Sequence, residues 1–141
     1  RQMKTVTSYL LWFALTIAVL TLIFRYFLSF GIESDSFAIV TTSATIYGFL
    51  MFVSGWYFGH KDEEYLPIYD IGFRFHLTTY AVHSAITLLW IGLGFCSKHE
   101  DTNISINILI YWGILLFIHF IFFLWSRKNS IKDLDKNDLF E

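Results

Sequence analysis

Four long apolar runs, divided by short polar stretches, account for most of this chain. The runs cover residues 6–30, 37–58, 73–96 and 104–125. A helix rises ~1.5 Å per residue, so each run is long enough to cross a hydrocarbon layer of about 30 Å. Backbone groups inside lipid must bond within their own segment, which makes each run a helix. The pattern predicts an all-α integral membrane protein with four spans.

The polar stretches predict how these helices are ordered. Because short connections make consecutive helices antiparallel neighbours, we expect an up-down-up-down four-helix bundle. Residues 1–126 form the transmembrane domain in this prediction, and residues 127–141 form a charged cytoplasmic tail. Residues 60–72, which include Asp62 and the helix breaker Pro67, are expected to form a solvated loop on the cytoplasmic side.

Lysine and arginine residues gather on one side of the predicted membrane. Eight of the ten lie near the N-terminus, in or beside the 60–72 loop, or in the tail, whereas Lys98 and Arg25 lie toward the other side. The positive-inside rule then places both termini in the cytoplasm, as four spans require. We expect Arg25 to extend outward and to pair with Glu33 or Asp35. The predicted location is a bacterial inner membrane, crossed several times.

Composition narrows the classes of function. Hydrophobic residues make up 55% of the 141 residues, and no run has the polar face that a soluble helix needs. The net charge of −2 and the absence of a basic stripe argue against a nucleic-acid partner. A single cysteine, Cys96, excludes disulfide exchange within the chain. None of the four runs contains the carboxylate that proton-coupled four-helix drug exporters use. We therefore expect no enzyme activity.

Small residues in the second run indicate a packing or association face. Serine, threonine and alanine occupy positions 41–45, and two glycines follow. Small side chains let helices approach closely in lipid, so we expect the closest helix contacts at Ser43, Gly48 and Gly55. The contact lies either within the bundle or between copies of the chain. In the second case the hydroxyl-rich face is a candidate pore lining.

Three histidines in the third and fourth runs are the candidate site. His76 and His83 are seven residues apart, so they share a helix face, and Tyr80 lies between them on that face. The helical rise places His76, His119 and His83 about 4, 10 and 15 Å from the cytoplasmic ends of their helices. Neutral histidines at these depths can fasten the two helices by hydrogen bonds. Alternatively, His76, His83 and His119 ligate a metal or a haem, or they sense pH.

Residues 72–126 resemble the bacterial "2TM domain" family. The first half of the resemblance is an aromatic residue, then His76-Leu77, then Tyr80 four positions after the histidine. The second half is Trp112-Gly113-Ile114, with His119 at the end of the same motif. The family often has asparagine where this chain has His83, which is a departure from the pattern.

This resemblance implies one packed group in an uncharacterised membrane module, which is found alone or attached to signalling proteins. The group consists of His76, Tyr80, Trp112, Gly113 and His119. The family supplies no enzyme activity. The first two runs lie outside the resemblance.

The leading hypothesis is a non-enzymatic inner-membrane helical module that acts as a sensor, scaffold or accessory subunit. Its expected partners are the lipid bilayer and either further copies of itself or another membrane protein. The first alternative is an oligomeric membrane pore or effector. The second is a histidine-ligated metal or haem protein, although the leading hypothesis needs no cofactor.

Overall fold

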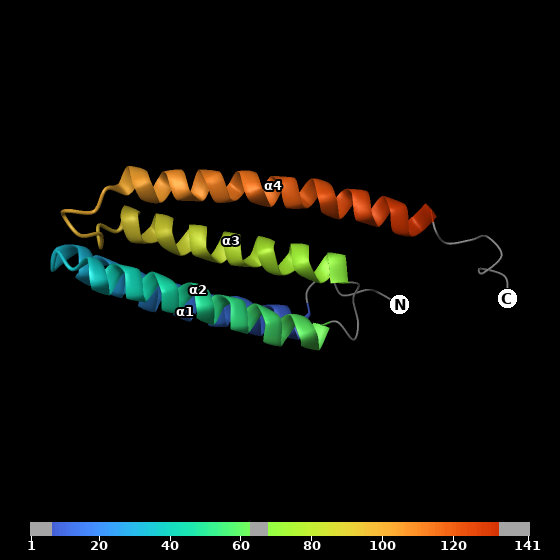
Figure 1. The fold of residues 1–141 in the computed structure, drawn as a ribbon, viewed down its shortest axis with the longest axis horizontal. Helices are drawn as coiled ribbons and strands as arrows, with labels where there is room; N and C mark the ends of the chain where they lie inside the picture. The colour runs from blue at the N-terminus through green and yellow to red at the C-terminus, as the bar shows by residue number, and fades with distance from the viewer. Residues whose placement is uncertain (1–6, 63–67, 133–141) are drawn as a thin grey trace.

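The chain forms an all-helical structure in a computed structural model that describes residues 7–62 and 68–132. Within these residues there are four helices and no strand (Figure 1). They are α1 (Ser8–Glu33), α2 (Phe37–Asp62), α3 (Ile68–Gly92) and α4 (Thr102–Lys132). The helices lie side by side along the long axis. The α1–α2 and α3–α4 connections lie together at one end of the molecule, on the left in Figure 1.

The connection between α1 and α2 is a tight turn of three residues. Asp35 adopts a left-handed backbone conformation, with φ of 51°, that aspartate tolerates better than most side chains. The amide of Ser36 donates to the carbonyl of Gly31 at 2.9 Å. A Cβ atom at Gly31 would lie 2.9 Å from Cγ2 of Val40. Glycine at position 31 therefore lets the start of α2 pack closely against the end of α1.

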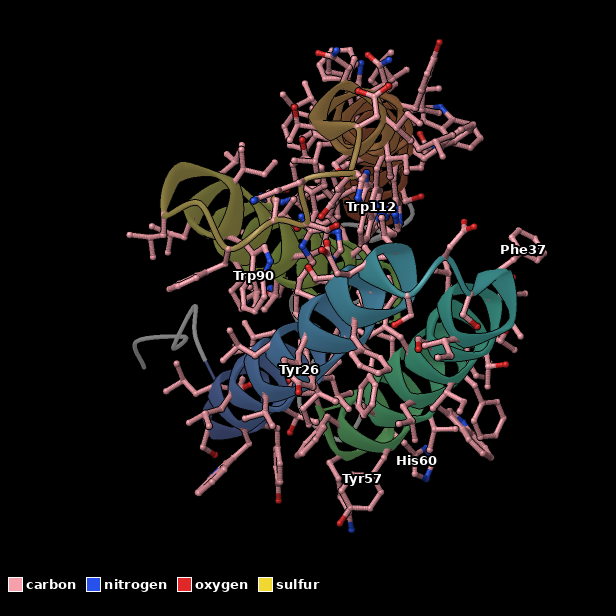
Figure 2. All side chains as sticks on the ribbon, turned by 90° about the vertical axis from the view of Figure 1, so that its left-hand side faces the viewer. Tyr26, Phe37, Tyr57, His60, Trp90 and Trp112 are labelled. Atoms are coloured by element: carbon pink, nitrogen blue, oxygen red, sulfur yellow. The ribbon has the colours of Figure 1, made fainter. Side chains whose placement is uncertain are left out.

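Helix α3 occupies the centre of the arrangement. It packs against α1, α2 and α4, whereas within the described residues the backbone of α4 comes close to α3 and not to α1 or α2. The end view shows α4 standing apart from α2, with Trp112 extending between α4 and the other helices (Figure 2). The four helices therefore do not close into the compact ring that a four-helix bundle suggests. Polar side chains and a cavity, described below, separate α4 from the α1–α2 pair.

A small apolar core joins α1 to α3. It consists of Phe13 and Ile17 of α1 with Ile71 and Phe75 of α3. The rings of Phe13 and Phe75 are tilted, with their centroids 4.6 Å apart. Most large apolar side chains on α2 and α4 are exposed instead, far beyond what a soluble monomer carries. These faces suit a lipid environment.

Three of the four helices are long and apolar enough to cross a membrane: Ser8–Glu33, Phe37–Asp62 and Thr102–Asn129. Within the described residues α3 does not reach that apolarity, so the predicted span at residues 73–96 stays a prediction. Arg74, His76, His83 and several hydroxyl residues lower its hydropathy. Because α3 has helices on several sides, protein atoms and not lipid face much of its polar surface.

The helices extend beyond the apolar runs. Helix α2 continues through residues 59–62, and α3 begins before residue 73 and ends before residue 96. Much of the predicted 60–72 loop is therefore helical, and residues 63–67 lie outside the described residues. Residues 127–132 of the predicted tail continue α4, and residues 133–141 lie outside the described residues. Lysine and arginine favour helix, so hydropathy alone places these helix ends too early.

Asp62 corrects the expectation of a solvated loop. Its side chain is 2% exposed at the end of α2. The hydroxyl of Thr7 donates to Oδ2 of Asp62 at 2.7 Å. Thr7 also caps α1, because its side chain accepts from the amide of Leu10 at 3.2 Å. One threonine therefore both starts α1 and binds the end of α2.

Candidate functional site

His76 and His119, together with Trp112, join α3 to α4. We call the two histidines the histidine pair. Nδ1 of His76 lies 2.9 Å from Nδ1 of His119. Nε1–H of Trp112 donates to Nε2 of His76 at 2.8 Å. An indole N–H is a donor only, so Nε2 of His76 must accept. A neutral His76 then carries its hydrogen on Nδ1 and donates it to Nδ1 of His119.

Tyr80 and Gly113 bring α3 and α4 close together one turn further along. The hydroxyl of Tyr80 donates to the carbonyl of Leu109 at 3.1 Å. A Cβ atom at Gly113 would lie 2.9 Å from the Tyr80 hydroxyl oxygen. The ring of Tyr80 also meets Trp112 edge-on, with centroids 5.7 Å apart. The structure thus brings together the five residues of the group that the family resemblance implies.

A second polar chain runs through α1, α2 and α3, and we call it the tyrosine chain. Thr21 donates its hydroxyl hydrogen to the carbonyl of Ile17 at 2.7 Å, so its oxygen is left to accept. The hydroxyl of Tyr47 donates to Thr21 at 2.8 Å. Tyr47 then accepts from Nδ1–H of His83 at 2.9 Å. Three helices are linked by one run of hydrogen bonds with a single consistent direction.

His83 therefore belongs to the tyrosine chain and not to the histidine pair. Within the described residues, no three histidine, cysteine, aspartate or glutamate side chains are grouped as a metal site. His76, His83 and His119 are thus not brought together as the metal hypothesis requires. The rings of His83 and Trp112 are close, with centroids 5.2 Å apart, so the two polar groups are neighbours. A haem on the histidine pair stays a prediction that the absorption spectrum of the purified protein tests.

The residues expected to form a packing face on α2 have unequal surroundings. Ser43 donates its hydroxyl to the carbonyl of Ile39 at 2.6 Å, within its own helix. A Cβ atom at Gly55 would lie 3.8 Å from the Phe13 ring, an ordinary contact. At Gly48 a Cβ atom would meet nothing within 4 Å. Packing of Gly48 within one chain is therefore not observed, and its contact between copies stays a prediction.

A buried ion pair links α1 to the connection between α3 and α4. Nη1 of Arg25 lies 3.0 Å from Oε1 of Glu100, and both side chains are almost fully buried. The expected pairing of Arg25 with Glu33 or Asp35 is wrong. Arg25 lies on the face of α1 that packs inward, so it extends toward Glu100 and not out to water. Glu33 instead accepts a hydrogen bond from the hydroxyl of Ser97.

A cavity of about 410 Å³ lies between these polar groups and the inner face of α4. The ion pair, the tyrosine chain and Trp112 all contribute to its wall. Its polar lining includes Arg25, Glu100, Thr87, His83 and Tyr47. Apolar residues of α1 and α4 form most of the remaining wall. The cavity is therefore a partly open space with a mainly apolar wall and a small group of polar side chains.

Sequence reasoning missed Thr21, Tyr47, Thr87 and Glu100. The spacing along the sequence could have indicated some of these residues. Thr21 and Arg25 are four residues apart on α1, so they share a helix face. The same spacing joins His83 to Thr87 on α3. Tyr47 gave no such signal, since one tyrosine in an aromatic-rich chain is indistinguishable from apolar filler.

Comparison of the chain with protein-family models, with curated proteins and with solved structures found no match. The resemblance of residues 72–126 to the 2TM domain family therefore stays a prediction.

Proposed function

We propose that this chain is a non-enzymatic sensor module of a bacterial inner membrane, with four up-down-up-down spans and both termini in the cytoplasm. Three sufficiently apolar helices support membrane residence. The fourth span, α3, becomes acceptable in lipid because its neighbours cover its polar face. The eight-to-two division of lysine and arginine supports the orientation.

The attachment of α4 carries the sensor proposal. Among the described helices, α4 packs closely only against α3, partly through the histidine pair and the Tyr80–Leu109 hydrogen bond. The cavity lies between α4 and the other two helices. Few directional bonds therefore set the position of α4, and a ligand or proton that changes them shifts the population between two positions.

The length of α4 provides a route for the output. Its 31 residues span about 46 Å at the helical rise, well beyond a hydrocarbon core of about 30 Å. The last turns carry the exposed basic residues Arg127 and Lys128. A displacement of α4 in the membrane moves this basic end, which a second copy or a partner protein can read.

Distance measurements between spin labels test the sensor proposal. One label pair joins α2 to α4, at Lys61→Cys and Arg127→Cys, in a Cys96→Ser background and in nanodiscs. We expect two distance populations whose ratio changes when His119→Leu removes the histidine pair. The matched control joins α1 to α2, at Ser8→Cys and Lys61→Cys, and should give one unchanged population. A single narrow α2–α4 distance, unaffected by His119→Leu, would refute the sensor.

Reporter fusions test the orientation separately. A reporter fused after Glu141 and one inserted at Lys98 should report opposite sides of the membrane. If both report the same side, the four-span arrangement is wrong, whatever the spin labels show.

One observation favours the pore or effector as a second candidate. Most of helix α2 is exposed, and one exposed face includes the small or hydroxyl-bearing residues Thr41, Thr45 and Gly48. Several copies that bring this face together would line a path. The purified particle would then have rotational symmetry, and liposomes that contain it would leak small ions. A monomeric particle without ion leak removes this candidate.

A further inference from the structure

Arg25 has hydrogen-bond donors that the protein does not use. Nη1 binds Glu100, but Nε and Nη2 have no partner and are out of reach of solvent. These two nitrogens share one edge of the planar guanidinium, the edge that binds both oxygens of a carboxylate or phosphate. A buried charged group with unmade hydrogen bonds is strongly unfavourable. A ligand that accepts hydrogen bonds from this edge would remove that unfavourable free energy.

Two further unpaired groups belong to the same site. Oε2 of Glu100 and the hydroxyl of Thr87 are buried without a partner. Arg25, Glu100 and Thr87 all line the cavity of about 410 Å³. The site thus offers a free cationic edge, a free carboxylate oxygen and a free hydroxyl. Binding of a ligand at this edge requires the guanidinium to turn toward the cavity, because Nε and Nη2 are buried in the unliganded chain.

Charge balance restricts what the cavity can hold. Arg25 and Glu100 neutralise each other in the buried pair, and Asp101, which also lines the cavity, is exposed to solvent. A simple anion would leave one uncompensated negative charge in a medium of low polarity, and a simple cation would leave one positive charge. A molecule with both charges keeps the site neutral and satisfies both unpaired partners.

We propose that this cavity binds a zwitterion that carries an oxyanion and an ammonium group a short distance apart. The oxyanion binds the Nε–Nη2 edge of Arg25, and the ammonium donates to Oε2 of Glu100. Thr87 donates its hydroxyl to the oxyanion. Apolar wall residues such as Phe24 and Ile108 hold the rest of the molecule.

Two sources supply this chemistry, an ethanolamine phospholipid head group and a small soluble zwitterion. A lipid head group would enter between α4 and the α1–α2 pair, whose backbones are not in close contact within the described residues. Access from water is open near the α3–α4 connection, where the exposed residue Asp101 also lines the cavity.

The inference rests on the proposed sensor, of which the cavity would be the input. The test is a binding titration of the full chain, purified free of lipid in detergent. The probes are phosphatidylethanolamine, phosphatidylcholine and phosphatidylglycerol with identical short chains, and free phosphoethanolamine. We expect phosphatidylethanolamine to bind roughly tenfold tighter than phosphatidylcholine, whose quaternary nitrogen has no hydrogen to donate to Glu100. Phosphatidylglycerol lacks the cation and should also bind weakly.

Variants locate the site. Arg25→Lys keeps the charge but loses the two-nitrogen edge, and Thr87→Val keeps the shape but loses the hydroxyl. Each should weaken phosphatidylethanolamine binding by roughly tenfold. Ser84→Ala is the matched control, because the Ser84 hydroxyl on α3 is also buried and unpartnered but does not line this cavity. Its affinity should equal that of the parent.

Equal affinity for phosphatidylethanolamine and phosphatidylcholine, or equal effects of Thr87→Val and Ser84→Ala, would overturn the site. Competition by free phosphoethanolamine identifies a soluble source, and its failure to compete identifies the lipid. If phosphatidylethanolamine binds selectively but the spin labels give a single distance, the binding site is supported and the sensor proposal is refuted. If the spin labels give two distances but no lipid binds selectively, the sensor proposal is supported and the binding site is refuted.

Discussion

His76 and His119 face each other nitrogen to nitrogen, with 2.9 Å between their Nδ1 atoms. Such a contact needs one hydrogen between the two rings, since two bare nitrogens or two N–H groups would repel. The N–H of Trp112 fixes which ring donates, because it occupies the other nitrogen of His76. The pair therefore has one direction, from α3 to α4.

His119→Leu should loosen the chain. The variant removes the acceptor of the His76 N–H and leaves that group unpaired between helices. Hydrogen bonds between membrane helices contribute about 1 kcal/mol, so the loss should be of that size. Thermal or detergent-induced unfolding measures it. His99→Gln, at an exposed position in the α3–α4 connection, is the control and should match the parent. Equal stability of both variants would show that the pair does not fasten α4.

Gly113→Ala should destabilise the contact between α3 and α4. The new Cβ would lie 2.9 Å from the Tyr80 hydroxyl oxygen and push it away from the Leu109 carbonyl. Overpacking of this kind costs about 1–3 kcal/mol. Gly48→Ala meets nothing within 4 Å and should leave the stability of the single chain unchanged or slightly raised. The unfolding midpoints of the two variants, measured in one detergent, give the comparison.

Gly48→Leu tests contact between copies of the chain. Gly48 is exposed and a Cβ atom there meets nothing within 4 Å, so we expect a leucine to disturb mainly what another molecule places against it. We expect a smaller particle by size-exclusion chromatography with light scattering, and Gly55→Leu should also loosen packing against Phe13. Phe122→Leu, at an exposed position on α4, is the control. An unchanged particle for Gly48→Leu means that this face is not an association face.

Glu100→Gln should be among the most damaging single changes. It leaves the buried Arg25 charge without its counter-ion, and breaking a buried ion pair costs about 3–5 kcal/mol. Asp35→Asn alters the partner that the sequence alone suggested, at an exposed position, and should have little effect. The ratio of folded to aggregated protein after mild heating distinguishes the two. If Asp35→Asn is the more harmful variant, the assigned ion pair is wrong.

Labelling of Cys96 should be slow at neutral pH and faster in alkali. Cys96 follows the end of α3, and its burial, reinforced by nearby Glu100, raises the pKa of its thiol. The thiolate is the reactive form, so a raised pKa lowers its fraction at pH 7, and the fraction grows as pH rises. A membrane-impermeant maleimide on intact cells measures the rate. Lys98→Cys in a Cys96→Ser background, at an exposed position, should react faster at neutral pH.

Apolar run length was sufficient to predict the helical class. Helical rise and the family resemblance grouped His76 with His119, but helical rise alone did not separate His83 from that group. The sequence did not predict the helix ends, since charged residues such as Lys61 and Arg127 continue a helix after hydropathy has fallen. It also missed the partner of Arg25. Glu100 is 75 positions away and lies in a connection, so neither spacing nor depth indicated the contact. Only the packing of α1 beside α3 brings the two charges together.

The central position of α3 has a consequence for how the chain is made. In the proposed membrane placement, α3 is the span least able to partition into lipid by itself. While the ribosome has yet to synthesise α4, His76 has no His119 to donate to, and Tyr80 has no Leu109 carbonyl. The third span would therefore insert stably into the membrane only after the fourth span has been synthesised. A nonsense mutation within α4 would then remove two spans from the membrane rather than one.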